Sequence, residues 1–557
     1  MRALKFLPVV MALVPFPLVA APQQQPTLTE VVDKIIAQEQ AEVQSLRQYS
    51  PVVETYIQTL RPDKDLGAQP NGDKYFLGRA EHANGVALEP LISGTRTKQS
   101  KLASLGSVFG TEFLPRGFLQ MIYLDTTGFD RQHYKFNYAG REFLGEVRCL
   151  IFDLDPISKD DKGRFVGRIW VEDQDYHIVR FNGGYSGRSK NSYYFNFDSW
   201  RTNAGKNEWL PALIYSEELN SATAPAFRAQ TRLWNYAPRH AVEEQELNKV
   251  LVETAKPVKD QSEIANGYSP LEEKRAWARQ AEDNVAAKME QLGLMAPYGD
   301  VDKVLETVVN NLDVTNDLDI QPAVRCRILM TSTLESFTMG HTIVLSRGLV
   351  DVLPDEASLA AILAHELGHV VLGHRMGTQF GFFNQLRFDE TKTFHHFGFA
   401  HTPEEEQAAT QKGVELLKNS PYKDQPGNAR LFLQALNDRS KEIPNLVSPH
   451  LGNGIMTGLT SLAAQPTAAQ GVDPKPKGDA VAALPVGGRI RVEPWNNQLQ
   501  LLKSKSVGTV ARYEVTPFEL TPFVLYLTRQ GESASAEPAG QSSLKSDSDA
   551  NLAFIKP

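Results

Sequence analysis

The sequence predicts a multidomain α+β protein with an N-terminal antiparallel β-rich domain, a mainly helical domain with a small sheet, and a small C-terminal β-module. The first observation is length, because 557 residues are too many for one hydrophobic core. The second is that short β-type runs alternate with turn residues in residues 74–239. The third is a change to helical spacing of apolar residues after residue 269.

The first residues, "MRALKFLPVVMALVPFPLVAAP", have the layout of a secretory signal. Arg2 and Lys5 precede an apolar run at positions 6–18, and the small residues Ala20 and Ala21 follow it. We therefore expect residues 1–21 to be a cleaved signal peptide and the protein to be exported, with the periplasm as its compartment. No later stretch has about 18 uninterrupted apolar residues, so no transmembrane anchor is expected.

The overall charge argues against nucleic acid as a partner. Lys and Arg number 58 against 66 Asp and Glu, which gives a net charge of -8. No basic block is present that could follow a phosphate backbone.

The β-rich domain is expected to span residues 27–260. Its strand candidates are "KYFLGRAE", "FLQMIYLD", "HYKFNYAG", "RFVGRIWVED", "HIVRFNGGY", "SYYFNFDSW" and "FRAQTRLWNY". The stretch "GRIWVEDQDYHIVRFNG" resembles the strand-turn-strand unit of the periplasmic lipoprotein-carrier fold, a curved sheet around an apolar cavity. A generic antiparallel scaffold explains the same runs. Cys149 and Cys326 lie in strand-like stretches and form either a disulfide between domains or two buried thiols.

A capping box predicts the helix that follows the sheet. Ser269 is its N-cap, Pro270 its first residue and Glu272 the third residue after the cap, while Gly293 ends the helix. The remaining boundaries come from composition: a helical connector at 265–300, the helical domain at 301–462, an Ala/Pro/Gly-rich linker at 463–484, the β-module at 485–530 and a disordered tail at 531–557.

The stretch "LAAILAHELGHVVLGH", residues 359–374, contains the candidate metal ligands and the candidate general base. Its apolar residues recur at steps of three and four, so it predicts a helix, with Asp355 as N-cap and an end near Gly377. His365 and His369 then lie one turn apart on one face, with Glu366 beside them. This is the H-E-x-x-H motif, in which two histidines bind zinc and the glutamate is the general base toward a metal-bound water.

Two other positions of the site were considered from helical geometry. His374 is nine residues from His365, about half a turn away around a continuous helix, so a structural role is expected. The third zinc ligand has several candidates, namely His395, His396, His401, Glu404, Glu405 and Glu406. Glu406 is favoured, because the residue one helical turn later, Thr410, is polar and can support a ligand.

Residues 301–459 resemble the M48 family of zinc metalloproteases, which are gluzincins. The stretch "TIVLSRGLVDVLPDEASLAAILAHELGHVVLGH" follows the family pattern, and "EQAAT" matches the family's E-x-x-A-D helix, which again places the third ligand at Glu406. Thr410 replaces the family aspartate, so weaker support of a metal ligand is expected. "ESF", residues 335–337, stands where the family has Asn-Ala-Phe in its substrate-aligning edge strand.

The resemblance also implies a role for His450. It lies in "VSPHLG", which is similar to the family's Ser-Thr-His-Pro stretch, so it is a candidate donor to a developing oxyanion; a merely solvated loop histidine is the alternative. The phenylalanine-rich segment 378–401 is either a lid over an apolar cleft or an insertion that buries its own aromatic residues.

Together these features predict an exported zinc metalloendopeptidase with one Zn²⁺ per chain. Its expected substrate is a polypeptide, unfolded or membrane-associated, that adds as a strand to the sheet edge beside the metal helix. A role in protein quality control of the cell envelope is expected. The alternative is a binding protein or chaperone-like holdase with a weak or inactive metal site, which the Thr410 replacement motivates.

Overall fold

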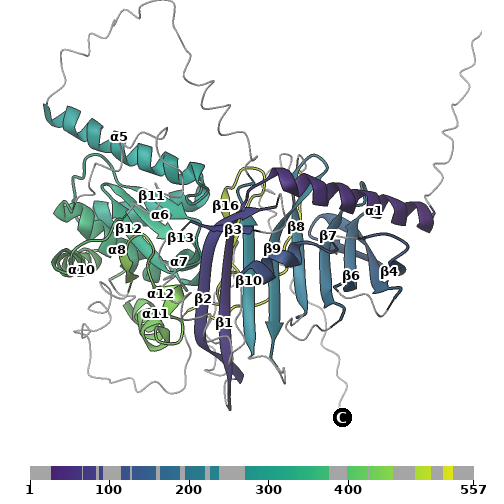
Figure 1. Ribbon diagram of the computed structural model, residues 1–557. Helices are drawn as coiled ribbons and strands as arrows, with labels where there is room; N and C mark the ends of the chain where they lie inside the picture. Colours follow the sequence, from purple (N-terminus) through teal and green to yellow (C-terminus); the bar gives the residue numbers. More distant parts are fainter. Residues whose placement is uncertain are drawn as a thin grey trace, which may run out of the picture.

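The computed structural model describes residues 27–64, 67–82, 87–91, 115–125, 128–158, 163–187, 195–219, 226–236, 270–374, 398–423, 426–455, 483–502 and 518–530. Two parts lie side by side, a large curved sheet and a helical part with a small sheet (Figure 1). The expected combination of an N-terminal antiparallel sheet and later helices is confirmed. The predicted signal peptide, tail and phenylalanine-rich segment 378–397 lie outside the described residues, as does most of the linker.

The large sheet is antiparallel throughout, in the order β3-β2-β1-β10-β9-β8-β7-β6-β5-β4. Five of the expected runs lie in β2, β4, β6, β7 and β10, and the sixth, "SYYFNFDSW", reaches the described strand β8 only at its end. The strand bounds are Val52–Asp63 (β1), Gly67–Glu81 (β2), Ala87–Pro90 (β3), Tyr134–Leu144 (β4), Val147–Pro156 (β5), Phe165–Glu172 (β6), Ile178–Tyr185 (β7), Phe197–Gly205 (β8), Glu208–Glu218 (β9) and Phe227–Trp234 (β10).

The run "FLQMIYLD" was wrongly predicted as a strand. It forms the short helix α3 (Pro115–Leu119) and the 3₁₀ turn η3 (Gln120–Ile122). A short apolar run does not distinguish a strand from a buried helical turn, and here the run packs against the sheet as part of its core. Three strands, β1, β3 and β9, were not predicted, and β1 lies before the range with β-type runs.

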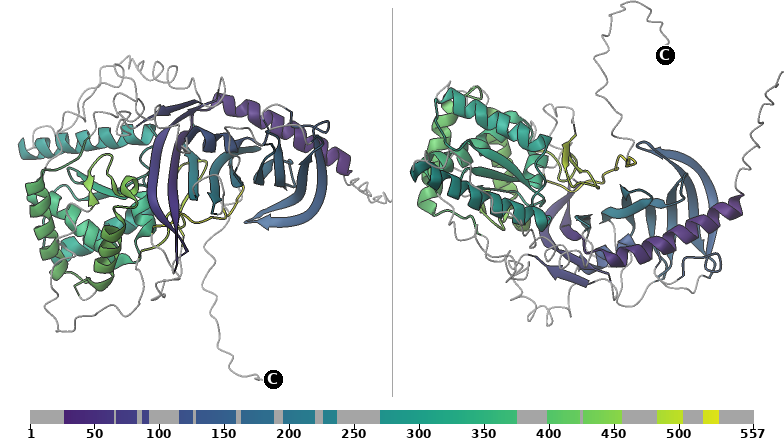
Figure 2. Two further views of the ribbon diagram at one scale, coloured as in Figure 1. Left: turned by 60° about the horizontal axis from the view of Figure 1, so that its bottom comes forward. Right: turned by 90° about the horizontal axis from the view of Figure 1, so that it is seen from above.

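Each face of the large sheet is covered by a different segment. Ile151 and Phe152, neighbours in β5, belong to two separate apolar clusters, as alternation along a strand requires. The Phe152 cluster is covered by α1 (Leu28–Ser45), which begins with a capping box of Thr27 and Glu30. The Ile151 cluster is covered by residues 523–527 (Figure 2). Those residues lie within the β-module predicted at 485–530, but they form no strand.

The helical part holds a four-stranded sheet in the order β11-β13-β12-β14. The strands are Arg325–Leu329 (β11), Glu335–Met339 (β12), Thr342–Ser346 (β13) and Asn453–Gly454 (β14). Its helices are α5 (Pro270–Gln291), α6 (Asp300–Thr315), α7 (Arg347–Val352), α8 (Glu356–Leu372), α10 (Pro403–Lys418), α11 (Pro426–Arg439) and α12 (Pro444–Val447). In the other part, the 3₁₀ turn η1 (Leu46–Gln48) follows α1. The C-terminal module is the hairpin of β15 (Ile490–Val492) and β16 (Leu499–Leu501).

A buried ion pair links the large sheet to the helical part. Glu54 of β1 is 2% exposed and forms an ion pair of 3.0 Å with Arg347, the first residue of α7. The same carboxylate accepts hydrogen bonds from the backbone N–H and hydroxyl of Ser332 and from the Tyr75 hydroxyl. Both Cys149 and Cys326 are free and buried, so the thiol alternative holds and the disulfide does not form.

Candidate metal centre

The predicted metal helix is present as α8. Asp355 is its N-cap, and its side chain accepts a hydrogen bond from the Ser358 N–H. His365 and His369 lie one turn apart and both are buried. The run of apolar residues on both sides buries the helix between α6, α10 and the small sheet, which fixes the direction of the two imidazoles.

Glu406 of α10 completes the cluster. Its carboxylate oxygens lie 3.3 Å from His365 Nε2 and 3.4 Å from His369 Nε2. Zinc–ligand bonds of about 2.0–2.1 Å in a tetrahedral site separate ligand atoms by about 3.3 Å, so these three groups fit a zinc ion. Burial acts to raise the pKa of Glu406, but hydrogen bonds from the two histidines and Asn453 outweigh burial and hold it well below its usual range.

Two glycines allow α10 to approach α8 this closely. A Cβ on Gly368, between the two histidines, would lie 2.5 Å from the Ala409 carbonyl oxygen. A Cβ on Gly413 would lie 3.0 Å from the Ala364 oxygen. Larger residues at either position would therefore push Glu406 away from the histidines.

Thr410 contacts His365, one of the two histidines of the motif. Its Oγ1 is 3.2 Å from His365 Nδ1, and its hydroxyl donates to the Glu406 carbonyl oxygen at 2.8 Å. Because the hydroxyl proton is used in that second bond, Oγ1 accepts from the Nδ1–H of His365. In the neutral ring this tautomer places the lone pair on Nε2, where a metal ion would take the place of the hydrogen bond to Glu406.

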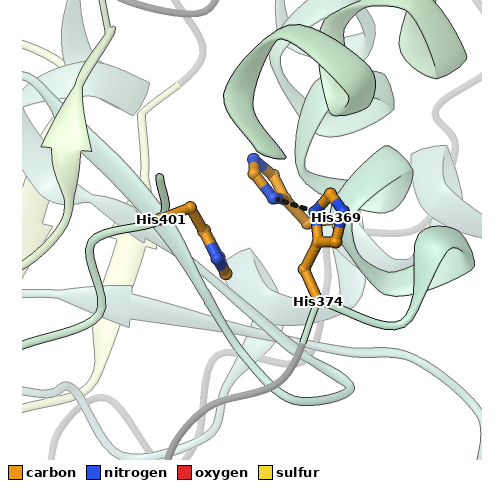
Figure 3. A group of neighbouring side chains, drawn as sticks. All are labelled: His369, His374 and His401. Carbon is orange, nitrogen blue, oxygen red and sulfur yellow. Dashed lines mark hydrogen bonds between the residues drawn. The ribbon is translucent and has the colours of Figure 1, made fainter. Parts of the chain in front are cut away.

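His374 contacts His369, against the expectation from helical geometry. The helix ends at Leu372, and Gly373 at φ 73° turns the chain back. As a result His374 Nδ1 lies 2.9 Å from His369 Nδ1 (Figure 3). The prediction of opposite faces was wrong because it assumed a helix that continues to residue 377.

His401 lies beside the same histidine. Its ring stacks on His369 with a centroid distance of 4.0 Å and an interplanar angle of 18° (Figure 3). The ring nitrogens of His369, His374 and His401 are close enough to suggest a second metal cluster. However, stacked rings direct their lone pairs in parallel, so His369 and His401 do not converge on one ion as arranged. Burial lowers the pKa of His401 to about 4, with the His369 charge as the next cause. His395 and His396 lie outside the described residues.

Glu366 faces a small cavity at the cluster. It is 3% exposed, burial raises its pKa, and the Ser336 hydroxyl donates to its Oε1 at 2.6 Å. The cavity has a volume of about 10 Å³, close to what one water molecule requires. Its walls comprise Ser336, Phe337, His365, Glu366, Phe399, His401, Glu406, Asn453 and Ile455.

The sheet edge expected to receive substrate is paired with the chain itself. β12 pairs on its outer side with β14, Glu335 opposite Gly454 and Ser336 opposite Asn453. The Asn453 amide also donates to Glu406 Oε1 at 2.5 Å and to the His401 carbonyl oxygen at 3.0 Å. Sequence analysis missed Asn453, because nothing near it in the sequence signals a contact with Glu406.

His450 lies near this strand but is not among the residues that line the cavity. Its backbone N–H donates to Glu335 Oε2 at 3.0 Å, and its ring stacks on Tyr75 of β2 at a centroid distance of 5.0 Å. Among the described residues, its buried Nε2 has no hydrogen-bond partner.

These features define a metallopeptidase of the H-E-x-x-H class, in which a following helix supplies a carboxylate. Residues 298–412 match the model of peptidase family M48, which confirms for this part of the chain the resemblance that its sequence predicts. Comparison with curated proteins finds no match. No helix in the described part of the chain is both long and apolar enough to cross a membrane.

Proposed function

We propose that this M48 metallopeptidase is a zinc-dependent endopeptidase, exported to the periplasm, where it cleaves unfolded or membrane-associated polypeptides. The observation that carries the proposal is the separation of the ligand atoms of His365, His369 and Glu406, which matches a tetrahedral zinc site. The signal-like first residues support export.

Each residue of the metal centre has a separate role in the proposed hydrolysis. His365, His369 and Glu406 would hold a zinc ion, which would polarise a peptide carbonyl and lower the pKa of a water molecule. Glu366 accepts the proton of the attacking water at its carboxylate and passes it to the leaving amine. Ser336 orients that carboxylate through its hydrogen bond to Oε1. His450 is the candidate donor to the developing oxyanion only if its ring leaves Tyr75.

An extended substrate would take the place of β14 on the outer edge of β12. That edge provides backbone hydrogen bonds next to Glu366, which Ser336 of β12 contacts, and two residue pairs hold β14 there. Displacement of β14 would also free the oxygen of Glu406 that Asn453 now contacts.

The test combines metal analysis with hydrolysis of casein, an unfolded protein. We expect wild type to bind one zinc ion per chain and to cleave casein within the chain, and Glu366→Gln to keep zinc but lose cleavage, because Glu366 is not a ligand. A Glu366→Gln protein that retains more than a few per cent of activity would refute the general-base assignment. Client binding unchanged by metal removal, with no cleavage, would favour the holdase alternative.

A further inference from the structure

A second cavity, far larger than the one at Glu366, lies where the two parts of the molecule and the C-terminal module meet. Its volume is about 80 Å³, against about 10 Å³ at the metal centre. β15 and β16 lie between the large sheet and the helical part (Figure 2). The cavity walls include residues of β8, β9 and β10, Arg347 of α7, Arg491 of β15 and residues 523 and 525–528.

Arg232 of β10 carries a charge that no acidic side chain balances by contact. Its guanidinium donates to two neutral oxygens, Gln230 Oε1 at 3.2 Å and the Gly487 carbonyl at 2.9 Å. Within the described ranges, no carboxylate oxygen lies within ion-pair distance of it. Burial lowers the pKa of Arg232 to about 10, and the charge of Arg347 contributes to the same direction.

The two carboxylates whose charges act on Arg232, those of Glu54 and Asp351, are already engaged. Glu54 is held by Arg347, Ser332 and Tyr75. Asp351 accepts hydrogen bonds from the backbone N–H groups of Gly487, Arg489 and Ile490. Arg491 donates to the Thr528 hydroxyl and lies over the Tyr526 ring. Arg232, Arg347 and Arg491 therefore line one cavity, and its described lining contains no aspartate or glutamate.

Arg232 is half-buried and only neutral oxygens accept its hydrogen bonds, so an anion that binds beside it would add the missing counter-charge. A carboxylate matches the planar fork of a guanidinium, with which it forms two parallel hydrogen bonds. The other walls are largely apolar and include Leu213, Trp234 and Leu527, each at most 5% exposed. The matching ligand has one anionic end and a short hydrocarbon body.

We propose that this cavity binds a small aliphatic carboxylate, with the carboxylate at Arg232 and the hydrocarbon against Leu213 and Trp234. The ligand would contact both the large sheet and Arg347, which begins the helix preceding α8. The site is independent of zinc and of hydrolysis.

Isothermal titration calorimetry on the full chain tests the proposal, with hexanoate as the probe. Hexanoate is expected to bind in the millimolar range or tighter, as its few heavy atoms allow. Hexanol, which lacks the charge, is expected to bind at least about tenfold more weakly. Equal binding of hexanol, or no binding of hexanoate, would overturn the proposal.

Two variants locate the site. Arg232→Gln is expected to weaken hexanoate binding about tenfold or more, whereas Arg168→Gln, at an arginine of β6 paired with Asp153 outside the cavity, is expected to leave it unchanged. Ala212→Leu adds volume to the cavity wall without changing its charge and is expected to weaken binding as well. Circular dichroism establishes that each variant is folded. Wild-type affinity in a folded Arg232→Gln or Ala212→Leu protein would show that hexanoate binds elsewhere and would reject the site.

Discussion

The Ser336 hydroxyl donates a 2.6 Å hydrogen bond to Oε1 of Glu366, the candidate general base. Ser336 is the middle residue of "ESF", where the resembling family has alanine. The bond favours the ionised form of a carboxylate whose pKa burial otherwise raises.

Ser336→Ala should therefore move the acidic limb of the activity profile. Without the donor, the pKa of Glu366 rises further, so the base is protonated at a higher pH and kcat/KM falls at a higher pH than in wild type. The measurement is kcat/KM against pH for both proteins. The predicted role of Ser336 is wrong if the limb stays in place or moves to lower pH.

Thr410→Val should weaken zinc binding by about 10- to 100-fold, because His365 loses the acceptor that holds its Nδ1–H. Thr410→Ser keeps the hydroxyl and serves as the matched control, with affinity close to wild type. Competition with a chelator measures both. Equal affinities in the valine and serine variants would mean that the hydroxyl does not support the ligand.

Glu406→Gln should lose zinc, whereas Glu405→Gln and His401→Ala should keep it. Glu406 lies within 3.4 Å of both histidine Nε2 atoms, whereas Glu405 caps its own helix through Thr402. Zinc content after dialysis is the measurement. Normal zinc in the Glu406 variant together with loss in either other protein would assign the third ligand elsewhere.

His374→Ala should lower zinc affinity in a protein that is still folded. The imidazole of His374 contacts His369 Nδ1 at 2.9 Å, and such partners orient a metal-binding histidine. The expected loss is about tenfold, measured by chelator competition, with His133→Ala, in the turn before β4, as the control. An unchanged affinity would restrict His374 to a structural role.

Glu54→Gln should reduce the free energy of unfolding by about 3–5 kcal/mol, because it leaves Arg347 buried without its counter-charge. Urea denaturation measures the change. Asp153→Asn, which breaks an exposed ion pair with Arg168, is the control and should cost about 0–1 kcal/mol. A loss in Glu54→Gln no larger than in this control would show that the pair does not hold the two parts together.

The sequence by itself determined the features that depend on near neighbours in the chain. The spacing of His365, Glu366 and His369 specifies one helix face, and the i, i+4 relation of Glu406 to Thr410 singled out the residue that the fold brings to that face. The start of the metal helix at Asp355 was also predictable, because capping involves residues three or four apart.

Only the tertiary structure decided the contacts between distant residues. β14 lies on β12, Glu54 pairs with Arg347, and residues 523–527 cover the large sheet, each across more than 100 positions of sequence. No local pattern encodes such pairs, because a strand edge or a buried charge is satisfied by whichever segment the packing of the whole chain brings to it. His374 shows the same limit at short range, since one left-handed residue, Gly373, redirects a side chain that helical periodicity had placed elsewhere.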